Sequence, residues 1–467
     1  MTVKCKKVKI VATLGPASDN PKTIEKLIHA GVNVFRINCA HLKSAREIKE
    51  RIRRVRAAEK KAGMPVSVLA DLAGPKVRIG GVEAIREVQT GERIIFAKKG
   101  DGKGRLTLND SHLLKKLNTG TNIYLGDGTI KLRVIGRTGD EVRTRVEIGG
   151  ALRPRMGFQA VGVTLQKFIL SAKDRADLMA ALLAGVDAVA LSFVQHPRDL
   201  MSVRKLFPKK GAPLLFAKIE TKDAVKNAER IIDEADGLLI ARGDLGFSVP
   251  LAELPYIQKE LIDLALKKAK PVITATQMLE SMITSPYPTR AEVTDVAKAI
   301  LDGTGAVMLS GETAAGKFPE ETVKMMVSII KAAEPRIVAR EYPDETTTAA
   351  AVSAGVIKTA RQIKARLIIV FTESGGTARR IARHRFGIPI IALSPNQKTV
   401  EHLNFTWNVY PKRIKKVKSV DELIAVARHY AQKNDILKVP LGERYIISAG
   451  LPLGLTGTTN LLLVQKI

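Results

Sequence analysis

Charged residues able to do chemistry stand where several short apolar runs of the sequence end. Lys218 and Glu220 close one such run, and Asp244 closes the next one along the chain. Residues two apart on a strand point to the same side, so the Lys218 ammonium and the Glu220 carboxylate are expected to face one space. Two carboxylates with room left for substrate oxygens suit Mg²⁺ or Mn²⁺. An ammonium beside such an ion would stabilise an enolate or a phosphoryl group in transfer.

Further polar groups close the other apolar runs. Arg36 and Arg78 supply planar guanidinium groups that match phosphate oxygens. The segment from Gly243 to Gly246 is expected to open a short helix whose free amides hold a carboxylate. Taken singly, each residue also has a structural interpretation, such as a simple ion pair or a helix cap. Seven polar run ends together favour an active site, and the remaining members are Asn38, His41, Asp71, Lys76, Ser192, Arg242, Thr276, Gln277, Ser310 and Glu312.

The elements that must position these residues alternate regularly along the chain. Apolar, β-branched runs expected as strands are followed by amphipathic stretches expected as helices. Eight such units, with strands apolar on both faces, predict an α/β fold with a closed (β/α)₈ TIM barrel, whose active site lies at the C-terminal strand ends. An open doubly wound sheet is the alternative. The expected strands are 8–14, 32–38, 65–71, 187–194, 212–220, 236–244, 271–278 and 306–312, and the expected helices are 20–30, 43–62, 171–184, 197–206, 222–235, 252–269, 290–302 and 319–333.

Two further units interrupt and follow the barrel, which is assigned residues 1–76 and 156–335. Residues 77–155 hold short strand-like runs separated by Gly-Asp pairs at 100–101, 126–127 and 139–140, typical of a small all-β unit. Inserted after the third strand, this small β-barrel lid is expected to sit over the barrel mouth. Residues 336–467 predict a smaller C-terminal α/β domain, with helices 348–364, 377–385 and 419–433 and strands 366–372, 389–394, 444–449 and 460–466.

Composition limits the class of protein. The chain has 467 residues, consistent with about three domains. Aromatic residues make up only 4%, which weighs against a protein that stacks on single-stranded bases. The net charge of +30 favours anionic partners, but no zinc-finger or basic-zipper pattern accompanies it, so nucleic acid is not the expected partner. With only Cys5 and Cys39 and no long apolar run, a reduced cytoplasmic setting is expected, without disulfides or a membrane span.

Several segments, in their order along the chain, resemble the pyruvate kinase family over essentially the whole sequence. The resemblance implies a barrel, a lid inserted after the third strand and a C-terminal regulatory domain. It further implies a cytoplasmic, homotetrameric phosphotransferase that makes pyruvate and ATP from phosphoenolpyruvate and ADP in the last step of glycolysis. The most specific segments are ARGDLG (241–246), ATQMLESM (275–282) and MLSGETA (308–314), supported by VATLGPAS (11–18), GPKVR (74–78), AKIE (217–220) and PTRAEVTDVA (288–297).

The resemblance also implies a role for each matching residue. Lys218 would stabilise the phosphoryl group and the enolate, Arg36 would contact the phosphoryl group, and Glu220 and Asp244 would hold Mg²⁺ or Mn²⁺. The amides of Gly243 and Asp244 and the Thr276 hydroxyl would hold the substrate carboxylate, and Thr276 would help position the water that protonates enolpyruvate. On the nucleotide side would lie Asn38, His41 and Arg78, with a second metal ion arriving on ADP.

Two departures from the family pattern alter these expectations. At the monovalent-cation site Asn38 and Asp71 remain, but the Ser position is Ala40 and the usual acidic residue is Lys76. A tethered ammonium there can replace the charge of K⁺, so K⁺ is not expected to be required. The alternative is that Lys76 points to solvent and K⁺ still binds. Where the lid rejoins the barrel, Met156-Gly157-Phe158-Gln159 replaces a Lys-Gly-Val-Asn-like run, which alters the lid's contact with nucleotide.

The C-terminal domain contains a loop of Ser, Thr and Gly at a predicted helix start, with Thr372, Ser374, Gly375 and Thr377. Such a loop can cradle phosphate, and by resemblance it would bind a phosphorylated allosteric effector. An ordinary helix cap is the alternative. For the whole chain, the rival enzyme class is a metal-dependent lyase of oxo-acids, which would also use strand-end carboxylates but would need neither a lid nor the phosphate-facing Arg36 and Arg78. A nucleic-acid-binding protein is the second rival.

Overall fold

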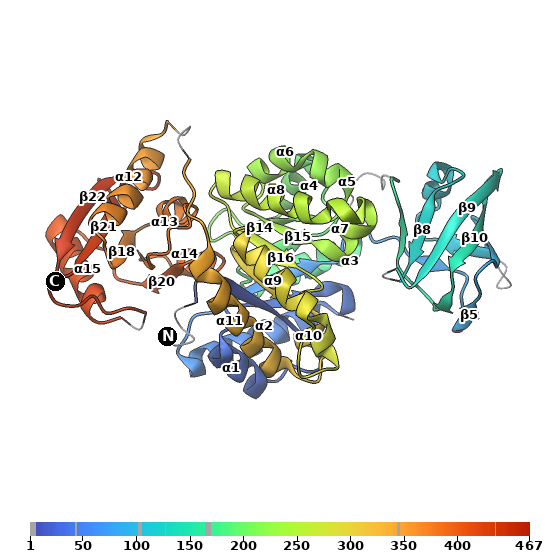
Figure 1. Ribbon diagram of the computed structural model, residues 1–467, viewed down its shortest axis with the longest axis horizontal. Coiled ribbons are helices and arrows are strands. Elements are labelled where there is room, and N and C mark those ends of the chain that lie inside the picture. The colour runs from blue at the N-terminus through green and yellow to red at the C-terminus, as the bar shows by residue number, and fades with distance from the viewer. Residues whose placement is uncertain are drawn as a thin grey trace.

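Eight parallel strands close into a barrel at the centre of the molecule (Figure 1). This computed structural model describes residues 6–42, 44–100, 105–126, 128–163, 170–342, 346–434 and 436–467. The predicted (β/α)₈ barrel is confirmed, because β17 pairs with β1 and leaves no open edge. The strands, in their order around the barrel, are β1 (Lys9–Leu14), β2 (Val34–Asn38), β3 (Ser67–Leu72), β13 (Ala188–Leu191), β14 (Leu214–Ile219), β15 (Gly237–Ala241), β16 (Val272–Ala275) and β17 (Ala306–Leu309).

The helices that surround the barrel begin at the expected capping residues. The Asn20 side chain accepts a hydrogen bond from the Thr23 amide, and Thr289 forms a reciprocal capping box with Glu292. Several expectations are wrong in detail: helix 222–235 is two helices that meet at Asn227, and the strands expected at 187–194, 236–244, 271–278 and 306–312 stop at Leu191, Ala241, Ala275 and Leu309. The helices are α1 (Pro21–Ala30), α2 (Ala45–Ala62), α3 (Ala172–Leu183), α4 (Pro197–Arg204), α5 (Lys222–Lys226), α6 (Ala228–Glu234), α7 (Arg242–Ser248), α8 (Leu254–Lys267), α9 (Arg290–Leu301), α10 (Gly311–Ala314) and α11 (Pro319–Ala333).

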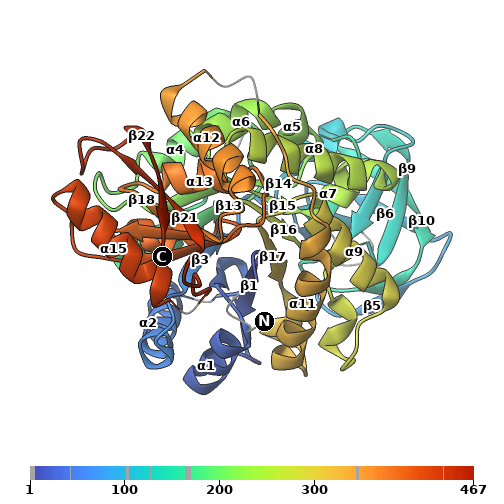
Figure 2. The same cartoon turned by 60° about the vertical axis from the view of Figure 1, so that its left-hand side comes forward.

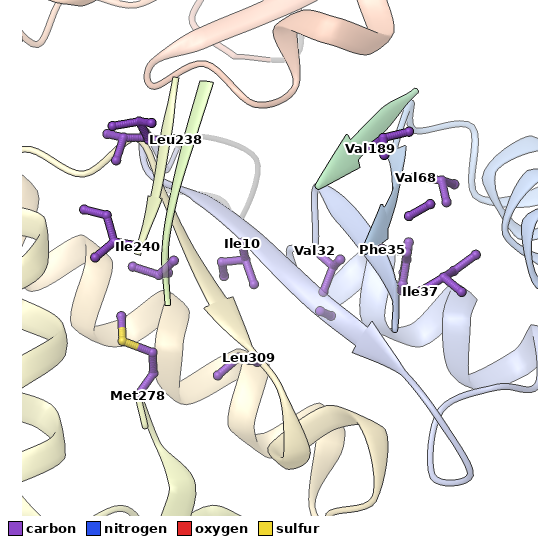
Figure 3. Close-up of a cluster of buried hydrophobic side chains, with 14 of the residues drawn as sticks. Ile10, Val32, Phe35, Ile37, Val68, Val189, Leu238, Ile240, Met278 and Leu309 are labelled. Carbon is purple, nitrogen blue, oxygen red and sulfur yellow. The ribbon is translucent and has the colours of Figure 1, made fainter. Parts of the chain in front are cut away.

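Successive residues of each barrel strand face opposite sides. One set packs outward against the helices, as Ile10, Ile37 and Val68 do in Figure 3. The alternate set fills the interior of the barrel with Val11, Val34, Leu69, Phe216, Leu239, Ile273 and Met308. Phe405 of the C-terminal domain joins this interior cluster, with its ring 5.1 Å from that of Phe216. The barrel is therefore a packed core at its N-terminal end rather than a channel.

The lid is a small, nearly closed barrel of its own at one side of the molecule (Figure 1). An isolated bridge between Arg78 and Gly157 joins the two edges of its seven-stranded sheet. Gly139 and Asp140 form the two-residue turn between β9 and β10, as their sequence predicts, whereas Asp101 and Asp127 lie outside the described residues. The lid strands are β4 (Ile79–Gly80), β5 (Arg86–Val88), β6 (Arg93–Phe96), β7 (Arg105–Leu108), β8 (Asn122–Leu125), β9 (Ile130–Thr138), β10 (Glu141–Ile148), β11 (Gly150–Leu152) and β12 (Phe158–Ala160).

The C-terminal domain packs against the N-terminal end of the barrel, opposite the lid (Figures 1 and 2). The Lys9 ammonium of β1 donates to the Val409 carbonyl over 2.6 Å, and the Ser67 hydroxyl of β3 donates to the Glu401 carbonyl over 2.6 Å. Two short elements, α14 and β20, are missing from the sequence prediction. The domain contains α12 (Thr348–Gln362), α13 (Gly376–Ala382), α14 (Gln397–Leu403) and α15 (Val420–Gln432) around β18 (Leu367–Phe371), β19 (Ile390–Ser394), β20 (Val409–Arg413), β21 (Arg444–Gly450) and β22 (Thr459–Lys466).

Two expectations about the chain's setting can be compared with the structure. Within the described ranges, no helix is both long and apolar enough to cross a membrane. Cys39 is buried and carries a free thiol, and burial raises its pKa. Cys5 lies outside the described residues.

Candidate active site

The interior of the barrel changes from apolar to charged toward the C-terminal ends of its strands. Side chains two residues apart face the same way, and on three of the strands an inward-facing apolar residue is followed by an inward-facing charged one. Arg36 follows Val34 in this way on β2, and Lys218 follows Phe216 on β14. Asp71 likewise follows Leu69 on β3. The alternation of the strands therefore brings a guanidinium, a carboxylate and an ammonium to one end of the barrel.

Arg36, Asp71 and Lys218 form a buried ion network. Arg36 Nε and Nη2 both lie 2.7 Å from Asp71 Oδ2, while Lys218 Nζ lies 3.1 Å from Asp71 Oδ1. Thr13 on β1 orients the arginine from the other side, because its hydroxyl accepts from Arg36 Nη1 over 3.1 Å. Both cations are thereby held by one carboxylate in a defined position.

Glu220 extends this network on the far side of Lys218. Lys218 Nζ lies 3.0 Å from Glu220 Oε1, and the Phe193 amide donates to Glu220 Oε2 over 2.7 Å. Lys218 also donates to the Ser192 hydroxyl over 2.7 Å. The paired orientation of Lys218 and Glu220 expected from their spacing is thus observed. Their carboxylate–ammonium contact belongs to a wider network rather than to an isolated pair.

The charges of this network determine its protonation. Burial disfavours the ionised forms, but the Lys218 and Arg36 cations outweigh it and hold the pKa of Asp71 below its usual value. Burial likewise opposes the charge of Lys218, yet Asp71 and Glu220 keep its pKa above the ordinary value. Lys218 is therefore a permanent ammonium near neutral pH, as electrostatic stabilisation of a transferring anion requires.

A cavity of about 670 Å³ lies between this charged end of the barrel and the lid. Four buried residues of the network, Arg36, Asp71, Lys218 and Glu220, form its barrel side. Lid and re-entry residues, among them Thr129, Arg153 and Met156, form the opposite side. The other predicted site residues on its wall are Asn38, His41, Lys76, Arg78, Ser192 and Asp244.

The predicted nucleotide side of this cavity is partly pre-ordered. The Asn38 side-chain oxygen accepts from the Ala40 amide over 3.2 Å, and Arg78 Nη1 donates to the Arg155 carbonyl over 3.0 Å. Burial, followed by the positive charges of Arg36, Arg78 and Lys76, lowers the pKa of His41. The imidazole is therefore neutral near pH 7 and can both donate and accept a hydrogen bond.

Asp244 occupies the first turn of α7, directly after β15. Its Oδ1 accepts from Gln159 Nε2 over 2.5 Å and lies 3.3 Å from Lys76 Nζ. The helix starts earlier than predicted because Arg242 turns away from the cavity, and its Nη1 lies 2.7 Å from Asp295 Oδ2 while its Nη2 donates to the Thr276 carbonyl over 2.7 Å. Arg242 therefore anchors the strand ends and does not line the cavity, although its position in the sequence had placed it among the polar strand-end residues.

Gly243 and Thr276 lie beside the cavity and contact each other. The Gly243 amide donates to Thr276 Oγ1 over 2.8 Å, and that hydroxyl donates to the Ala275 carbonyl over 2.6 Å. Neither residue lines the cavity of 670 Å³. Thr276 has a φ of 69° and Gln277 a φ of 52°, so β16 ends in an unusual left-handed turn that brings the Thr276 hydroxyl back to α7.

Glu220 and Asp244 have the chemistry of a divalent-metal site. Both line the same cavity, and both reach a smaller adjoining space of about 50 Å³. Burial raises the pKa of Glu220, the Lys218 ammonium opposes this, and the negative charge of Asp244 raises it further. A bound cation would relieve this mutual repulsion. With two carboxylates as its protein ligands, an ion held here would keep positions open for substrate oxygens.

The predicted effector loop lines a separate pocket of about 240 Å³ in the C-terminal domain. Thr372, Ser374 and Thr377 are on its wall, together with the side chains of Arg379 and Lys416. Gly375 has a φ of 81° and donates its amide to Thr372 Oγ1 over 2.9 Å, which shapes the loop from behind the wall. The hydroxyls of Thr377 and Thr459 share a hydrogen bond of 2.5 Å. The loop therefore borders a basic pocket, and Gly375 at its end is the N-cap residue of α13 without a side-chain cap.

Sequence reasoning missed two members of the cavity's surroundings. Thr13 was not singled out, although it follows the interior residue Val11 by two positions and the strand alternation could have identified it. Gln159 was noted only as a departure from a family pattern, and its contact with Asp244 spans 85 residues of sequence. No local signal reports such a contact.

Comparison with known proteins places this architecture in one family. The family model for the pyruvate kinase barrel domain matches residues 5–323, and the model for the pyruvate kinase alpha/beta domain matches residues 350–465. Pyruvate kinase of Methylorubrum extorquens is 40% identical, over 99% of this chain and 98% of its own length. The pyruvate kinases of Geobacillus stearothermophilus and of Staphylococcus aureus (strain MRSA252) are each 38% identical, over 99% of this chain and 80% of their own lengths.

Proposed function

Because the chain belongs to the pyruvate kinase family, and is thus a phosphotransferase, we propose that it transfers the phosphoryl group of phosphoenolpyruvate to ADP. The products are pyruvate and ATP, in the last step of glycolysis. The observation that carries the proposal is the pair of buried cations, Arg36 and Lys218, on the wall of a cavity that also holds three carboxylates. A lyase of oxo-acids would have no use for this second cation or for Arg78.

The substrate's two acidic ends are assigned to two parts of the site. The phosphoryl group is placed against Arg36 and Lys218, which already stand in a fixed mutual geometry through Asp71. The carboxylate is placed at the start of α7, where the amides of Gly243 and Asp244 and the Thr276 hydroxyl converge. When the substrate binds, its carboxylate accepts the hydrogen bond that the Gly243 amide now donates to Thr276 Oγ1. Thr276 is then free to orient the water that protonates enolpyruvate.

Glu220 and Asp244 are assigned to the divalent ion, Mg²⁺ or Mn²⁺. Such an ion supplies positive charge to the oxygens between which the phosphoryl group moves. The protein's own part is to keep Lys218 charged and directed at the same oxygens. Since Lys218 Nζ lies 3.0 Å from Glu220 Oε1, the ammonium and the proposed ligand are held together before substrate arrives.

The nucleotide is assigned to the lid side of the cavity, along Asn38, His41 and Arg78. ADP brings its own divalent ion. Met156 stands where a lysine would reach nucleotide phosphates, and the neighbouring Arg153 on the same wall offers a replacement charge. This assignment predicts that the lid contributes to the affinity for ADP through Arg153.

K⁺ is proposed to be dispensable. Lys76 lines the cavity with its side chain 29% exposed and pairs with Asp244, so it does not simply point to solvent. Both oxygens of Asp71 and the side-chain oxygen of Asn38 already hold hydrogen bonds or ion pairs, and Ala40 offers no hydroxyl. K⁺ would therefore have to displace the existing partners of Asp71 and Asn38.

The K⁺ proposal has a direct test. The rate of pyruvate formation in buffers free of K⁺ and NH₄⁺ should match the rate with K⁺ added. The double variant Ala40→Ser and Lys76→Glu should instead require K⁺. An increase of the parent's rate by orders of magnitude on adding K⁺ would refute the proposal.

A phosphorylated effector is proposed for the pocket at Thr372–Thr377, because Arg379 and Lys416 supply charge where the loop supplies hydroxyls. Saturation curves for phosphoenolpyruvate, recorded with a panel of sugar phosphates and nucleotides, test it; unresponsive curves would leave the loop as a cap. We also assign residues 1–76 and 156–335 to catalysis, 77–155 to the lid and 336–467 to regulation. A cytoplasmic homotetramer remains the expected form.

The activity itself is tested by a coupled assay with phosphoenolpyruvate, ADP and Mg²⁺. Formation of pyruvate and ATP in equal amounts supports the proposal. Glu220→Gln and Asp244→Asn should each reduce the rate strongly, and excess Mn²⁺ should recover part of it. Cleavage of an oxo-acid without phosphoryl transfer would support the lyase instead, and salt-sensitive DNA binding without turnover would support a nucleic-acid-binding protein.

A further inference from the structure

The two chain segments that join the lid to the barrel meet on one carboxylate oxygen. The chain leaves the barrel through Lys76 and returns through Gln159 on β12, and both side chains contact Asp244 Oδ1. The segments are also tied to each other, because the Phe158 amide donates to the Val77 carbonyl over 2.9 Å. A movement of the lid would therefore change the contacts of Asp244 directly.

Further contacts fix β12 and its neighbour against α7, the helix that carries Asp244. The rings of Tyr124 on β8 and Phe247 on α7 lie 5.2 Å apart. Gln159, Phe247 and Glu220 together line the space of about 50 Å³ next to Asp244. A space of this size holds an ion or a water molecule. The Gln159 side chain thus borders the same small space as the two proposed metal ligands.

One end of this amide has a partner and the other has none. Gln159 Nε2 donates to Asp244 over 2.5 Å, whereas Gln159 Oε1 is buried and, among the described residues, has no hydrogen-bond partner. A buried carbonyl oxygen without a partner is unfavourable, because it has lost its hydrogen bonds to water and gained none in the protein. The reverse orientation of the amide would set Oε1 against the Asp244 oxygen, which is favourable only with a cation between them. In the observed orientation, a positive ion in the adjoining space would give Oε1 the partner that it lacks.

We propose that Gln159 is the lid's contribution to the divalent-metal site, where its amide nitrogen positions Asp244 and its carbonyl oxygen supplies a further oxygen ligand to the ion. The inference rests on the proposed function, since it takes Glu220 and Asp244 as the metal ligands. An amide oxygen is a hard donor of the kind that Mg²⁺ and Mn²⁺ accept. Metal binding and closure of the lid are then one coupled event, because the third oxygen is present only while β12 lies against α7.

The test measures Mn²⁺ binding to the full chain by the electron paramagnetic resonance signal of the free ion. Gln159→Leu keeps much of the side-chain volume but removes both polar ends, and it should weaken Mn²⁺ binding about tenfold, as loss of such partners does in other metal sites. Gln159→Glu keeps an oxygen at the same reach and should bind Mn²⁺ at least as tightly as the parent. Gln89→Leu, at an exposed glutamine elsewhere in the lid, is the matched control and should change nothing.

Water proton relaxation by the bound Mn²⁺ gives a second measurement that does not depend on activity. Gln159→Leu should add one rapidly exchanging water to the ion, because a ligand position is vacated. Equal affinity and equal water number in Gln159→Leu and Gln89→Leu would overturn the inference. So would a loss in Gln159→Glu as large as in Gln159→Leu, which would leave the residue only a hydrogen-bond donor. If Glu220→Gln and Asp244→Asn also leave Mn²⁺ binding unchanged, the proposed metal site itself is wrong.

Discussion

Each end of the barrel holds a network of four charged residues, and the network at the C-terminal end lines a cavity. At the C-terminal end, Arg36, Asp71, Lys218 and Glu220 surround about 670 Å³ of space. At the N-terminal end, Asp187 pairs with Arg56 and lies 3.0 Å from Lys398 Nζ, which in turn lies 2.9 Å from Glu401 Oε2. Lys398 and Glu401 belong to α14 of the C-terminal domain, which covers this end.

The difference shows that burial and pairing of charges do not by themselves indicate an active site. In the network at the N-terminal end, the cations are directed at protein acceptors. These are the side chains of Asp187 and Glu401, and the Gly185 carbonyl, which accepts from Lys398 over 3.2 Å. Replacing such a buried network by apolar residues is often neutral, so its effect here is to fix how the C-terminal domain docks. In the network at the C-terminal end, Arg36 and Lys218 keep one side open to the cavity. The open side, rather than the charge count, is what permits substrate binding.

The largest effect is expected from a substitution of Lys218, in the network that faces the cavity. Lys218→Met removes the ammonium from the cavity and keeps the side-chain length, so phosphoryl transfer should fall by about 10³-fold, or about 4 kcal/mol. Asp71 keeps Arg36 and Glu220 keeps the Phe193 amide, and therefore folding should change little. Steady-state kinetics and thermal melting measured on the same preparation check both parts. A folded variant with near-parental turnover would remove Lys218 from the site.

At the N-terminal end of the barrel we expect the opposite outcome, a loss of stability without a loss of turnover. Asp187→Asn leaves Arg56 and Lys398 without their shared carboxylate and should lower the free energy of unfolding by about 3 kcal/mol. The loss stays at the low end of the usual range because Glu401 can ionise beside Lys398. Urea unfolding measures the loss. Turnover per folded molecule should match the parent at a temperature where both are folded, and a selective loss of turnover would show that the two ends are coupled.

Much of this arrangement could be predicted from the sequence. Eight alternating units predicted the barrel, and strand ends with Lys218, Glu220 and Asp71 predicted where its charges converge. The features that the sequence did not predict are either very short elements or contacts between residues far apart in the chain. The element α14 has only 7 residues and β20 only 5, so neither gave a clear periodic pattern. Likewise, nothing near Arg242 reports its contact with Asp295, and that contact turns the residue away from the cavity.

The two networks also differ in how predictable their members are. Lys218 and Glu220 stand two apart on one strand, so their common direction follows from local geometry. Asp187 and Lys398 are 211 residues apart and meet only because two domains dock. Their role could not be predicted from either segment alone. Sequence periodicity identifies residues that share an element, whereas contacts between domains require the fold.

A third, smaller effect is expected on the pH dependence of stability, from Glu401 at the N-terminal end of the barrel. Burial, followed by the neighbouring Asp187 carboxylate, raises the pKa of Glu401 to about 7. The folded protein then retains a proton that the unfolded chain releases, so this group's contribution is complete below pH 4.5 and is lost as pH rises toward 7. Glu401→Gln keeps the neutral form at all pH values. It should be more stable than the parent at pH 8, by about 1–3 kcal/mol, and nearly equal at pH 4.5.

The other groups around Glu401 set the controls for that measurement. Lys398 and Arg56 stay charged over this range. Burial lowers the pKa of His402 from 6.5 to about 4, so its contribution to stability is lost as pH falls below 6.5, which is opposite in sign to the effect of Glu401 and common to the parent and the variants. Glu443→Gln, at an exposed position of the same domain, should show no gain at pH 8. Unfolding curves recorded across pH 4.5–8 for the three proteins decide the matter. Parallel curves for the parent and Glu401→Gln would mean that Glu401 is ionised in the folded state.

The smallest effects come from one hydroxyl at each end of the barrel, and they divide the two roles most sharply. Thr13 Oγ1 accepts from Arg36 Nη1 over 3.1 Å at the cavity, whereas Ser67 Oγ donates to the Glu401 carbonyl over 2.6 Å at the domain interface. Each hydrogen bond is worth about 1 kcal/mol. Thr13→Val should therefore lower kcat/KM about fivefold, and it should also lower the free energy of unfolding by about 1 kcal/mol, because the buried Thr13 hydroxyl also donates to the Leu309 carbonyl over 2.8 Å. Ser67→Ala should leave kcat/KM unchanged and lower the free energy of unfolding by about 1 kcal/mol, because the sealed interface admits no replacement. If both variants lost activity and stability in the same proportion, access to the cavity would not be what distinguishes the two networks.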